Sequence, residues 1–269
     1  MDREPVVAGQ FYPAGAKALA AEVAGYLAQA AGPSEKPTLV AMVPHAGYVF
    51  SGAVAGKTLG EAHLAPTIIL LGPNHTGLGR PMALWPDGVW NFPGGGLEVD
   101  QELADALLAA EPALTPDTAA HSREHSLEVV GPFLWALNPA TRIVPIALAD
   151  PRLASLKALG ESLARVVAAF PRPVSLVVSS DMSHFLSQQR TKDQDSLALA
   201  AVLALDPAGL LSVVREREIS MCGVLPMTAA LFAAKALGAT SARVVAYATS
   251  GDVNHDHSRV VGYAGVLVE

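Results

Sequence analysis

Short apolar runs alternate with amphipathic segments along most of the chain. Runs rich in Val, Ile and Leu, bounded by Gly, Pro, Ser or Asn, are typical of buried parallel strands. We expect such strands at Thr38–Val43, Thr67–Leu71, Arg142–Leu148, Val174–Val178, Ala242–Ala248 and Val260–Val268. Helical spacing predicts helices at Ala16–Ala30, Ser51–Glu61, from Asp100 onward, and at Pro151–Phe170, Asp193–Leu205, Pro207–Arg217 and Val224–Leu237. This alternation predicts an α/β fold, a three-layer α/β/α domain with a mostly parallel central sheet.

Two further features concern the organisation of the chain. Asp100 and Asp150 are expected to cap the helices that follow them. The segment Gly77–Gly96, which contains Trp85 and Trp90, has no clear periodicity, and we expect it to be a long loop that walls the pocket. No repeat, linker or charge block divides the sequence, so residues 1–269 are expected to form a single domain.

Composition narrows the class of protein. With 51% hydrophobic and 16% charged residues, the 269-residue chain is expected to fold around a large core. A formal charge of -7 and the lack of a basic cluster argue against nucleic acid as a partner. No apolar stretch reaches the roughly 18 residues that span a bilayer, and the N-terminus does not resemble a signal peptide. We therefore expect a cytoplasmic protein that does not insert into a membrane.

Three histidines each follow one of the predicted strands within a few residues. His45 lies in Pro-His-Ala-Gly-Tyr, His75 ends Gly-Pro-Asn-His, and His184 ends Ser-Asp-Met-Ser-His. Parallel strands end along one edge of a sheet, and ligands of open α/β sheets bind outside that edge. We expect the three side chains to converge there as metal ligands or proton-transfer groups. The alternative for His45 and His75 is that each only caps a turn through hydrogen bonds.

The same edge is expected to receive other reactive side chains. Asp181 could orient an imidazole or bind a metal ion, or it could simply cap a turn, while His184 could act as an acid or base. Cys222 is the single cysteine, which excludes an internal disulfide and a Cys-only zinc cluster. It precedes a predicted helix, where it could be a nucleophile, a soft metal ligand or an inert buried thiol.

The remaining histidines give weaker signals. His121 and His125 are four residues apart, so a helix would place both on one face, with Glu128 adjacent to His125. Of these two histidines, we count only His125, with its glutamate partners, as a candidate site residue. His255 and His257 flank Asp256 in what we interpret as a solvated loop, and His63 is expected at a helix end.

These segments together resemble the Memo-like family, whose bacterial members are called AmmeMemoRadiSam system protein B. The resemblance spans almost the whole chain and rests on motifs at residues 8–13, 44–48, 72–75, 124–128, 179–184 and 222–223. It implies a fold like that of class III (LigB-type) extradiol dioxygenases. It also implies a metal site formed by His45, His75 and Cys222. His184 and His125 then match acid/base histidines of the dioxygenases, with Asp181 nearby.

The implied ligand set suggests which metal and which function to expect. Two imidazoles and a carboxylate suit Fe(II), and a thiolate in place of the carboxylate makes the set softer, so that it also suits Cu or Zn. Fe(II) is therefore the leading expectation, with Cu or Zn as alternatives. Our leading hypothesis is a non-haem iron protein with redox or dioxygenase-like activity on a small-molecule substrate. The alternatives are a non-catalytic module that binds a peptide or a radical-enzyme partner in the same cleft, and a zinc hydrolase.

Overall fold

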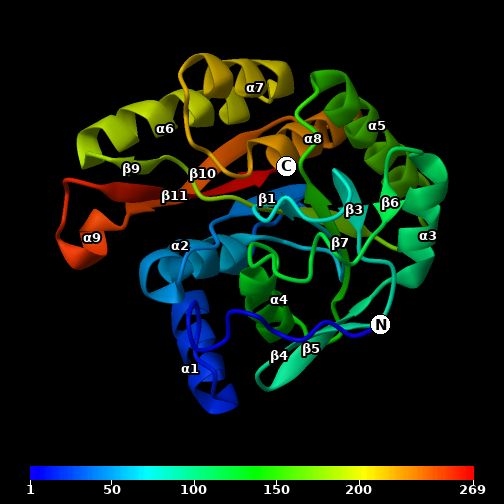
Figure 1. Cartoon of the computed structure of the whole chain (residues 1–269), viewed down its shortest axis with the longest axis horizontal. Coiled ribbons are helices and arrows are strands. Elements are labelled where there is room, and N and C mark those ends of the chain that lie inside the picture. The colour runs from blue at the N-terminus through cyan, green and yellow to red at the C-terminus, as the bar shows by residue number, and fades with distance from the viewer.

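The computed structural model describes residues 1–269 and contains one eleven-stranded sheet (Figure 1). Its strands are β1 (Val40–Val43), β2 (Thr67–Pro73), β3 (Met82–Leu84), β4 (Val89–Phe92), β5 (Gly95–Val99), β6 (Thr115–Pro116), β7 (Arg142–Leu148), β8 (Val174–Ser179), β9 (His184–Leu186), β10 (Ala242–Thr249) and β11 (Val260–Val268). The main path of the sheet is β10-β11-β1-β8-β2-β7-β3-β6. Neighbours among β1, β8, β2 and β7 are parallel, whereas β11 and β3 join this centre antiparallel.

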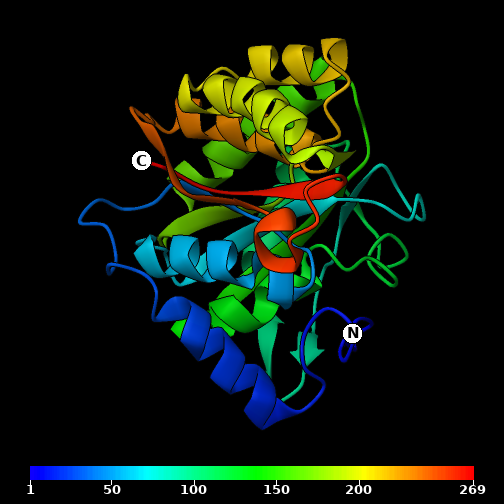
Figure 2. The same cartoon turned by 90° about the vertical axis from the view of Figure 1, so that its left-hand side faces the viewer.

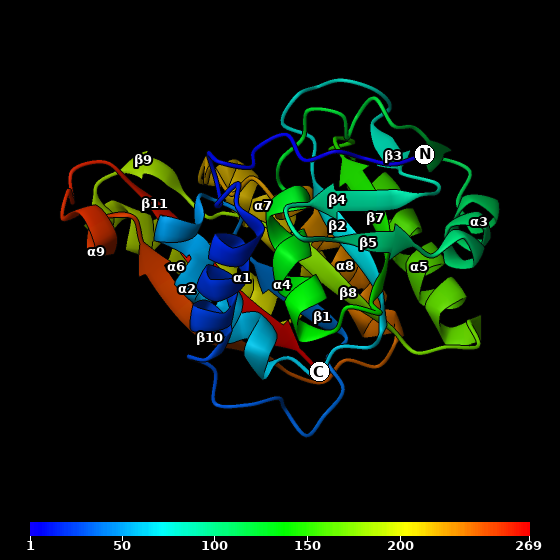
Figure 3. The same cartoon turned by 90° about the horizontal axis from the view of Figure 1, so that it is seen from below.

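Helices cover both faces of the sheet and complete the three predicted layers. The helices are α1 (Ala16–Leu27), α2 (Tyr48–Glu61), α3 (Gln101–Ala110), the 3-10 turn η1 (Glu128–Val130), α4 (Gly131–Leu137), α5 (Leu153–Ala169), α6 (Gln188–Leu203), α7 (Pro207–Glu216), α8 (Val224–Ala236) and α9 (Gly251–Asn254). Helices α5 to α8 pack above the sheet in Figure 1, and α1, α2 and α4 pack below it, as the view from below in Figure 3 also shows. None of these helices is both long and apolar enough to cross a bilayer. The α/β/α architecture is confirmed.

The alternation of side chains along the strands divides the core into two halves. Val40 and Met42 of β1 pack with the helices of the upper layer, whereas Ala41 and Val43 pack with those of the lower layer. All four side chains are fully buried. Successive side chains of a strand point to opposite faces, so a strand covered by helices on both sides must be apolar at every position. This is why the central strands appear in the sequence as continuous apolar runs.

The segment Gly77–Gly96 is not the loop that its composition suggested. It contains β3, β4 and the start of β5, and two of these strands pair directly with β7. Strands of three to five residues separated by Pro and Gly are too short to show a period, and their hydrogen bonds come from a partner some fifty residues away in sequence. The loop prediction was wrong because tertiary pairing, and not local pattern, determines this region.

The two predicted aspartate caps have different outcomes. The Asp100 carboxylate accepts a hydrogen bond from the Leu103 backbone N–H at 3.1 Å, which confirms it as the cap of α3. Asp150 does not cap α5, because that helix begins at Leu153 with Arg152 at its N-cap. The Asp150 carboxylate instead accepts from the backbone N–H of Arg152 and pairs with its guanidinium. The cap at Asp150 was therefore predicted wrongly.

The carboxyl ends of the central strands form the edge that carries the chemistry. In Figure 2 the start of β11 and strand β9 lie on the right, and the cyan and green loops project on the same side. These loops follow β2 and precede α4, and β1 runs antiparallel to β11, so its carboxyl end lies there too. The fold thus brings residues from distant parts of the sequence to one side of the sheet, as predicted.

Candidate metal centre

Three imidazoles come together at this edge. His45 follows β1, His75 follows β2, and His125 lies in the turns before η1. One ring nitrogen from each can be chosen so that all three lie within 4.8 Å of one another. The ring centroids are 5.3 Å apart for His45 and His75, 5.5 Å for His45 and His125, and 5.0 Å for His75 and His125. Three imidazoles so close together could hold a metal ion.

Hydrogen bonding fixes the protonation of His45. Its Nδ1 lies 2.6 Å from the Ser179 hydroxyl, which donates its own hydrogen to the Ser126 carbonyl at 2.7 Å. A hydroxyl has only one hydrogen to give, so its oxygen must accept from Nδ1–H of His45. The neutral ring then carries its lone pair on Nε2, the nitrogen that faces the cluster and Cys222. Burial lowers the pKa of His45 to about 4, although the charge of Asp181 opposes this, so the ring is neutral at pH 7.

A buried carboxylate holds His75 in the same way. Glu124 accepts from Nδ1 of His75 at 2.9 Å and from its backbone N–H at 2.5 Å, and it also accepts from the Ser126 N–H. Burial alone would raise the pKa of Glu124, but these hydrogen bonds hold it at about 2. Conversely, burial alone would lower the pKa of His75, but the Glu124 carboxylate raises it. A carboxylate behind an imidazole fixes its tautomer and strengthens it as a metal ligand.

The third imidazole, His125, is held more loosely. Its Nδ1 lies 3.6 Å from Glu124, beyond hydrogen-bonding distance. The ring stacks on His75 with an interplanar angle of 17° and packs against Phe11 at 4.7 Å between centroids. Burial lowers the pKa of His125, partly offset by Glu124. His125 is therefore a neutral imidazole without a fixed hydrogen-bond partner, free to bind a metal ion or to exchange a proton.

An N-terminal strap, residues 3–12, holds the segment that carries His125. Buried Glu128 receives the Arg3 guanidinium at 2.8 Å, the Tyr12 hydroxyl at 2.7 Å and two backbone N–H groups of the strap. Phe11, near the end of the strap, supplies the ring that packs on His125. The position of His125 therefore depends on residues more than a hundred positions earlier in the chain.

The cluster has the dimensions and the chemistry of a metal site. Nitrogen ligands bind Zn²⁺ at about 2.0–2.1 Å, and other first-row ions at similar distances, so two of them on one ion lie at most about 4 Å apart. The 4.8 Å span therefore needs only small side-chain rotations. The unprotonated Nε2 of His45, buried and with no partner but a thiol, also fits a ligand better than a structural histidine.

Cys222 and Asp181 lie beside His45. The Cys222 sulfur is 3.4 Å from Nε2 of His45 and accepts the backbone N–H of Asp181 at 3.1 Å. The Asp181 carboxylate accepts the backbone N–H of His45 at 2.8 Å, so it positions the loop that carries this ligand. Burial, assisted by the charge of Asp181, raises the pKa of the Cys222 thiol, so without a cation the sulfur stays protonated.

His184 lies outside the group of three imidazoles but is tied to the Cys222 loop. Its Nδ1 donates to the Ser220 carbonyl at 2.9 Å, and its backbone N–H donates to the Ser220 hydroxyl at 2.7 Å. Nε2 of the neutral ring is thus unprotonated and has no partner within the protein. Ser220 precedes Cys222 by two residues, which connects His184 to the candidate metal centre through a short segment.

The other histidines are placed elsewhere. Residues 119–123 form turns and residues 124–125 are irregular, so the helix considered for His121 and His125 is absent. His121 is fully buried and donates from Nε2 to the Ala83 carbonyl, and thus has a structural role that the sequence did not indicate. His255 ends α9, and the exposed loop at His255 and His257 agrees with its interpretation as solvated.

Sequence reasoning missed the side chains that hold the ligands from behind. Ser179, Ser126 and Glu124 orient His45 and His75 through contacts between residues that are 49 to 134 positions apart in the sequence. Glu124 was seen only as a partner of His125, its neighbour in sequence. Nothing in the sequence distinguished Glu124, because it lies in the polar run His121–Ser126, where an exposed acid is the ordinary expectation.

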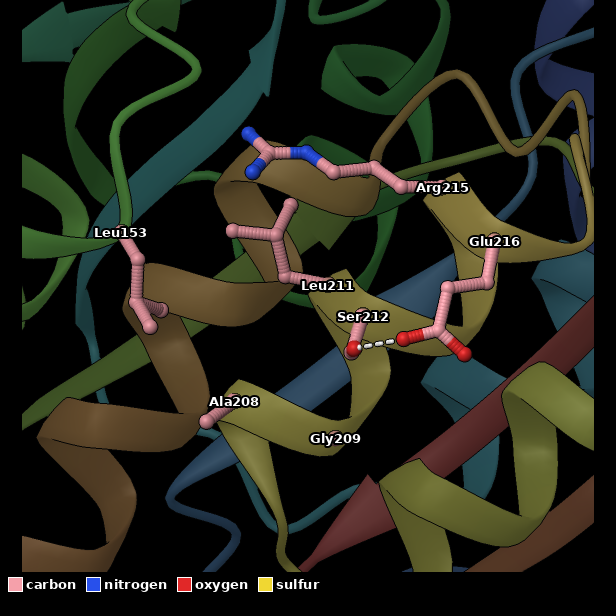
Figure 4. A pocket seen from close by; sticks show the side chains of 7 residues that line it. All are labelled: Leu153, Ala208, Gly209, Leu211, Ser212, Arg215 and Glu216. Atoms are coloured by element: carbon pink, nitrogen blue, oxygen red, sulfur yellow. Dashed lines mark hydrogen bonds between the residues drawn. The ribbon is translucent and has the colours of Figure 1, made fainter.

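A hollow of about 570 Å³ lies beside α7 and the start of α5, between Leu153, Leu211 and Arg215 (Figure 4). Its one drawn hydrogen bond joins Ser212 to Glu216 within α7. None of the side chains considered above lines it, so the convergence of imidazoles, and not the size of a cavity, identifies the candidate site.

Comparison with known proteins shows to which family the chain belongs. Residues 3–267 match the sequence profile described as "Memo-like protein". A MEMO1 family protein of Methanopyrus kandleri is 39% identical over 279 residues, which cover 99% of both chains. A MEMO1 family protein of Methanococcoides burtonii is 39% identical over 99% of this chain and 100% of the relative, and one of Ignicoccus hospitalis is 37% identical over 98% and 97%. The chain therefore belongs to the Memo-like protein family.

Proposed function

We propose that this protein binds one redox-active transition metal ion, Fe(II) in the first instance, at the imidazole cluster. The proposal rests on two imidazoles, His45 and His75. Nδ1 of each ring forms a hydrogen bond within the protein, which leaves Nε2 to bind a metal ion. A metal ion needs unprotonated nitrogens in fixed positions, and this arrangement provides them without rearranging the backbone.

The third ligand in this proposal is Cys222. Its sulfur lies 3.4 Å from Nε2 of His45, close to the separation of two neighbouring ligands on one ion, with metal–ligand bonds of about 2.3 Å for sulfur and 2.0–2.1 Å for nitrogen. Binding a cation would stabilise the thiolate, which burial disfavours in its absence. The competing third ligand is His125, which completes the set of three nitrogens.

The two ligand sets can be separated by cobalt substitution. Metal-free protein is titrated with Co(II) under anaerobic conditions, and the thiolate-to-cobalt charge-transfer band is recorded for the wild type, Cys222→Ser and His125→Ala. We expect the band in the wild type and in His125→Ala, and its loss in Cys222→Ser. A cobalt complex without that band in the wild type would assign the third position to His125, and no cobalt binding in any of the proteins would refute the metal centre itself.

The proposed activity is oxidation of a small molecule by O2. An Fe(II) ion held by these side chains would supply the electron transfer that oxidation by O2 needs. The chain supplies His184, whose Nδ1–H is held by Ser220 and whose Nε2 is free to take or give a proton. His125 provides a second imidazole for proton transfer, and Asp181 holds the His45 loop in position.

O2 consumption by the iron-reconstituted protein tests this activity. With ascorbate as electron donor, the wild type should consume O2 faster than the metal-free protein, and His184→Asn should bind iron equally well but consume O2 more slowly by about 10²-fold or more. Iron binding with no O2 consumption would favour the other function considered for this cleft, the binding of a peptide or of a radical-enzyme partner.

A further inference from the structure

Strand β9 contains a backbone conformation that the fold does not explain. Four residues other than glycine have a positive φ, and Leu205, Glu218 and His255 among them lie at the carboxyl ends of α6, α7 and α9. Helices commonly end in this way. The fourth, Phe185, has φ 63° within a strand. A bulky side chain in the left-handed region costs about 1–2 kcal/mol, so this residue needs another reason.

The conformation is that of a β-bulge. Leu186 pairs with Val260 and His184 pairs with Val261, so β9 advances two residues while β11 advances one. Phe185 is the extra residue, at a position where bulges of this type favour glycine. Bulges next to active sites often redirect a side chain, and here the bulge directly follows His184. The strain is therefore stored beside the histidine that we propose as the proton-transfer group.

The bulge exposes an aromatic ring that the core does not use. Phe185 is 63% exposed, the largest exposure of any aromatic side chain in the molecule, so its burial contributes little to stability. Its ring centroid is 5.8 Å from that of His184. The backbone is strained here, and it holds a large apolar ring in solvent next to a candidate catalytic imidazole. Neither feature stabilises the fold.

An arginine that pairs with no carboxylate accompanies the ring. The Arg259 guanidinium lies over Phe185, 5.3 Å from the ring centroid, and has neither a carboxylate within ion-pair distance nor a side-chain hydrogen bond. Arg259 is exposed and immediately precedes β11, the strand with which β9 pairs. A guanidinium binds carboxylates through two parallel hydrogen bonds, and an aromatic face binds flat rings. We call His184, Phe185 and Arg259 the β9 platform.

We propose that the β9 platform binds the carboxylate and the ring of a flat aromatic acid and delivers it to the candidate metal centre. The ligand places its carboxylate on Arg259 and its ring against Phe185, next to the imidazole of His184. The role of the platform in turnover rests on the proposed function, because it names the substrate class of that same site. Binding at the platform itself needs no metal ion and can be measured separately.

The test uses metal-free full-length protein and benzoate as the probe, with affinity measured by NMR titration. The wild type should bind benzoate more tightly than benzamide, which lacks the charge, or cyclohexanecarboxylate, which lacks the flat ring. Arg259→Gln and Phe185→Gly should each weaken benzoate binding at least tenfold. Arg217→Gln, at another exposed arginine, serves as the matched control and should leave binding unchanged.

Two outcomes would overturn the proposal: no saturable benzoate binding to the wild type, or equal affinity in Arg259→Gln. Thermal unfolding of Phe185→Gly checks that lost binding is not lost folding, because removing the strain should leave this variant at least as stable as the wild type. Benzoate binding without metal binding would support the platform and refute the metal centre. Metal binding without benzoate binding would support the metal centre and refute the platform.

Discussion

The imidazole cluster and the β9 platform lie at the same edge of the sheet but are built in opposite ways. In the cluster, His45 and His75 are held by buried hydrogen-bond partners, and the Nε2 atom that remains is the one a metal ion needs. In the platform, Phe185 is strained and exposed, and Arg259 lies over its ring without a carboxylate partner. Rigid support suits a group that must hold an ion, whereas unused contact surface suits a ligand that arrives from solvent.

The largest effect we expect is a pH dependence of stability, because buried imidazoles stay neutral in the folded protein. His121 is buried outside the cluster, and burial lowers its pKa to about 4, as it does for His45. In metal-free protein, the unfolded chain therefore binds a proton at His121 between pH 6.5 and 4 while the folded chain does not. Stability contributed by this neutral ring is complete above pH 6.5 and is lost as the pH falls toward 4, by about 1.4 kcal/mol per pH unit.

Urea unfolding of the metal-free protein between pH 7 and 4 measures this dependence. His121→Asn should reduce the slope by about one proton, leaving the part due to His45, whereas His63→Asn at an exposed position should not change it. An unaltered slope in His121→Asn would mean that this imidazole is protonated in the folded state, and that burial alone does not keep the cluster neutral.

The next effect tests the support behind the ligands. Glu124→Gln leaves an amide in place of the carboxylate that accepts from both N–H groups of His75, so the ring loses its fixed orientation and part of its basicity. We expect metal affinity to fall about 10–100-fold, measured by competition with a chromophoric chelator. Glu111→Gln is the matched control, since this buried acid accepts a hydrogen bond from the Ser162 hydroxyl at 2.9 Å and contacts no imidazole. Equal losses in the two variants would mean that general destabilisation, and not the carboxylate behind His75, lowers the metal affinity.

The smallest effect is expected at the platform. Phe185→Gly should raise the free energy of unfolding by up to about 1 kcal/mol, because glycine adopts a positive φ without strain and little buried area is lost. Phe185→Ala, which keeps the strain and removes the ring, should be less stable than Phe185→Gly. Thermal or urea unfolding of both variants provides the comparison. A clear loss of stability in Phe185→Gly would show that the ring stabilises the fold. The contrast between the imidazole cluster and the β9 platform would then be smaller.

The sequence predicted the parts of this structure that depend on local pattern. Continuous apolar runs located the central strands, and the position of His45 and His75 after two of them placed both imidazoles at one edge. The pairing of β3 and β5 with β7 could not be predicted, because these short strands show no period of their own. The same limit hid the roles of Ser179 and Glu124, since hydrogen bonds between distant segments leave no mark on neighbouring residues.

The N-terminal strap has a consequence for how this protein is handled. Arg3 and Tyr12 neutralise and cover Glu128, while Phe11 shields one side of His125. An affinity tag or protease that displaced these residues would leave a bare carboxylate inside the molecule and open the third imidazole to bulk water. Cleavage of the first dozen residues should therefore make it easier for the imidazoles to lose any ion that they hold.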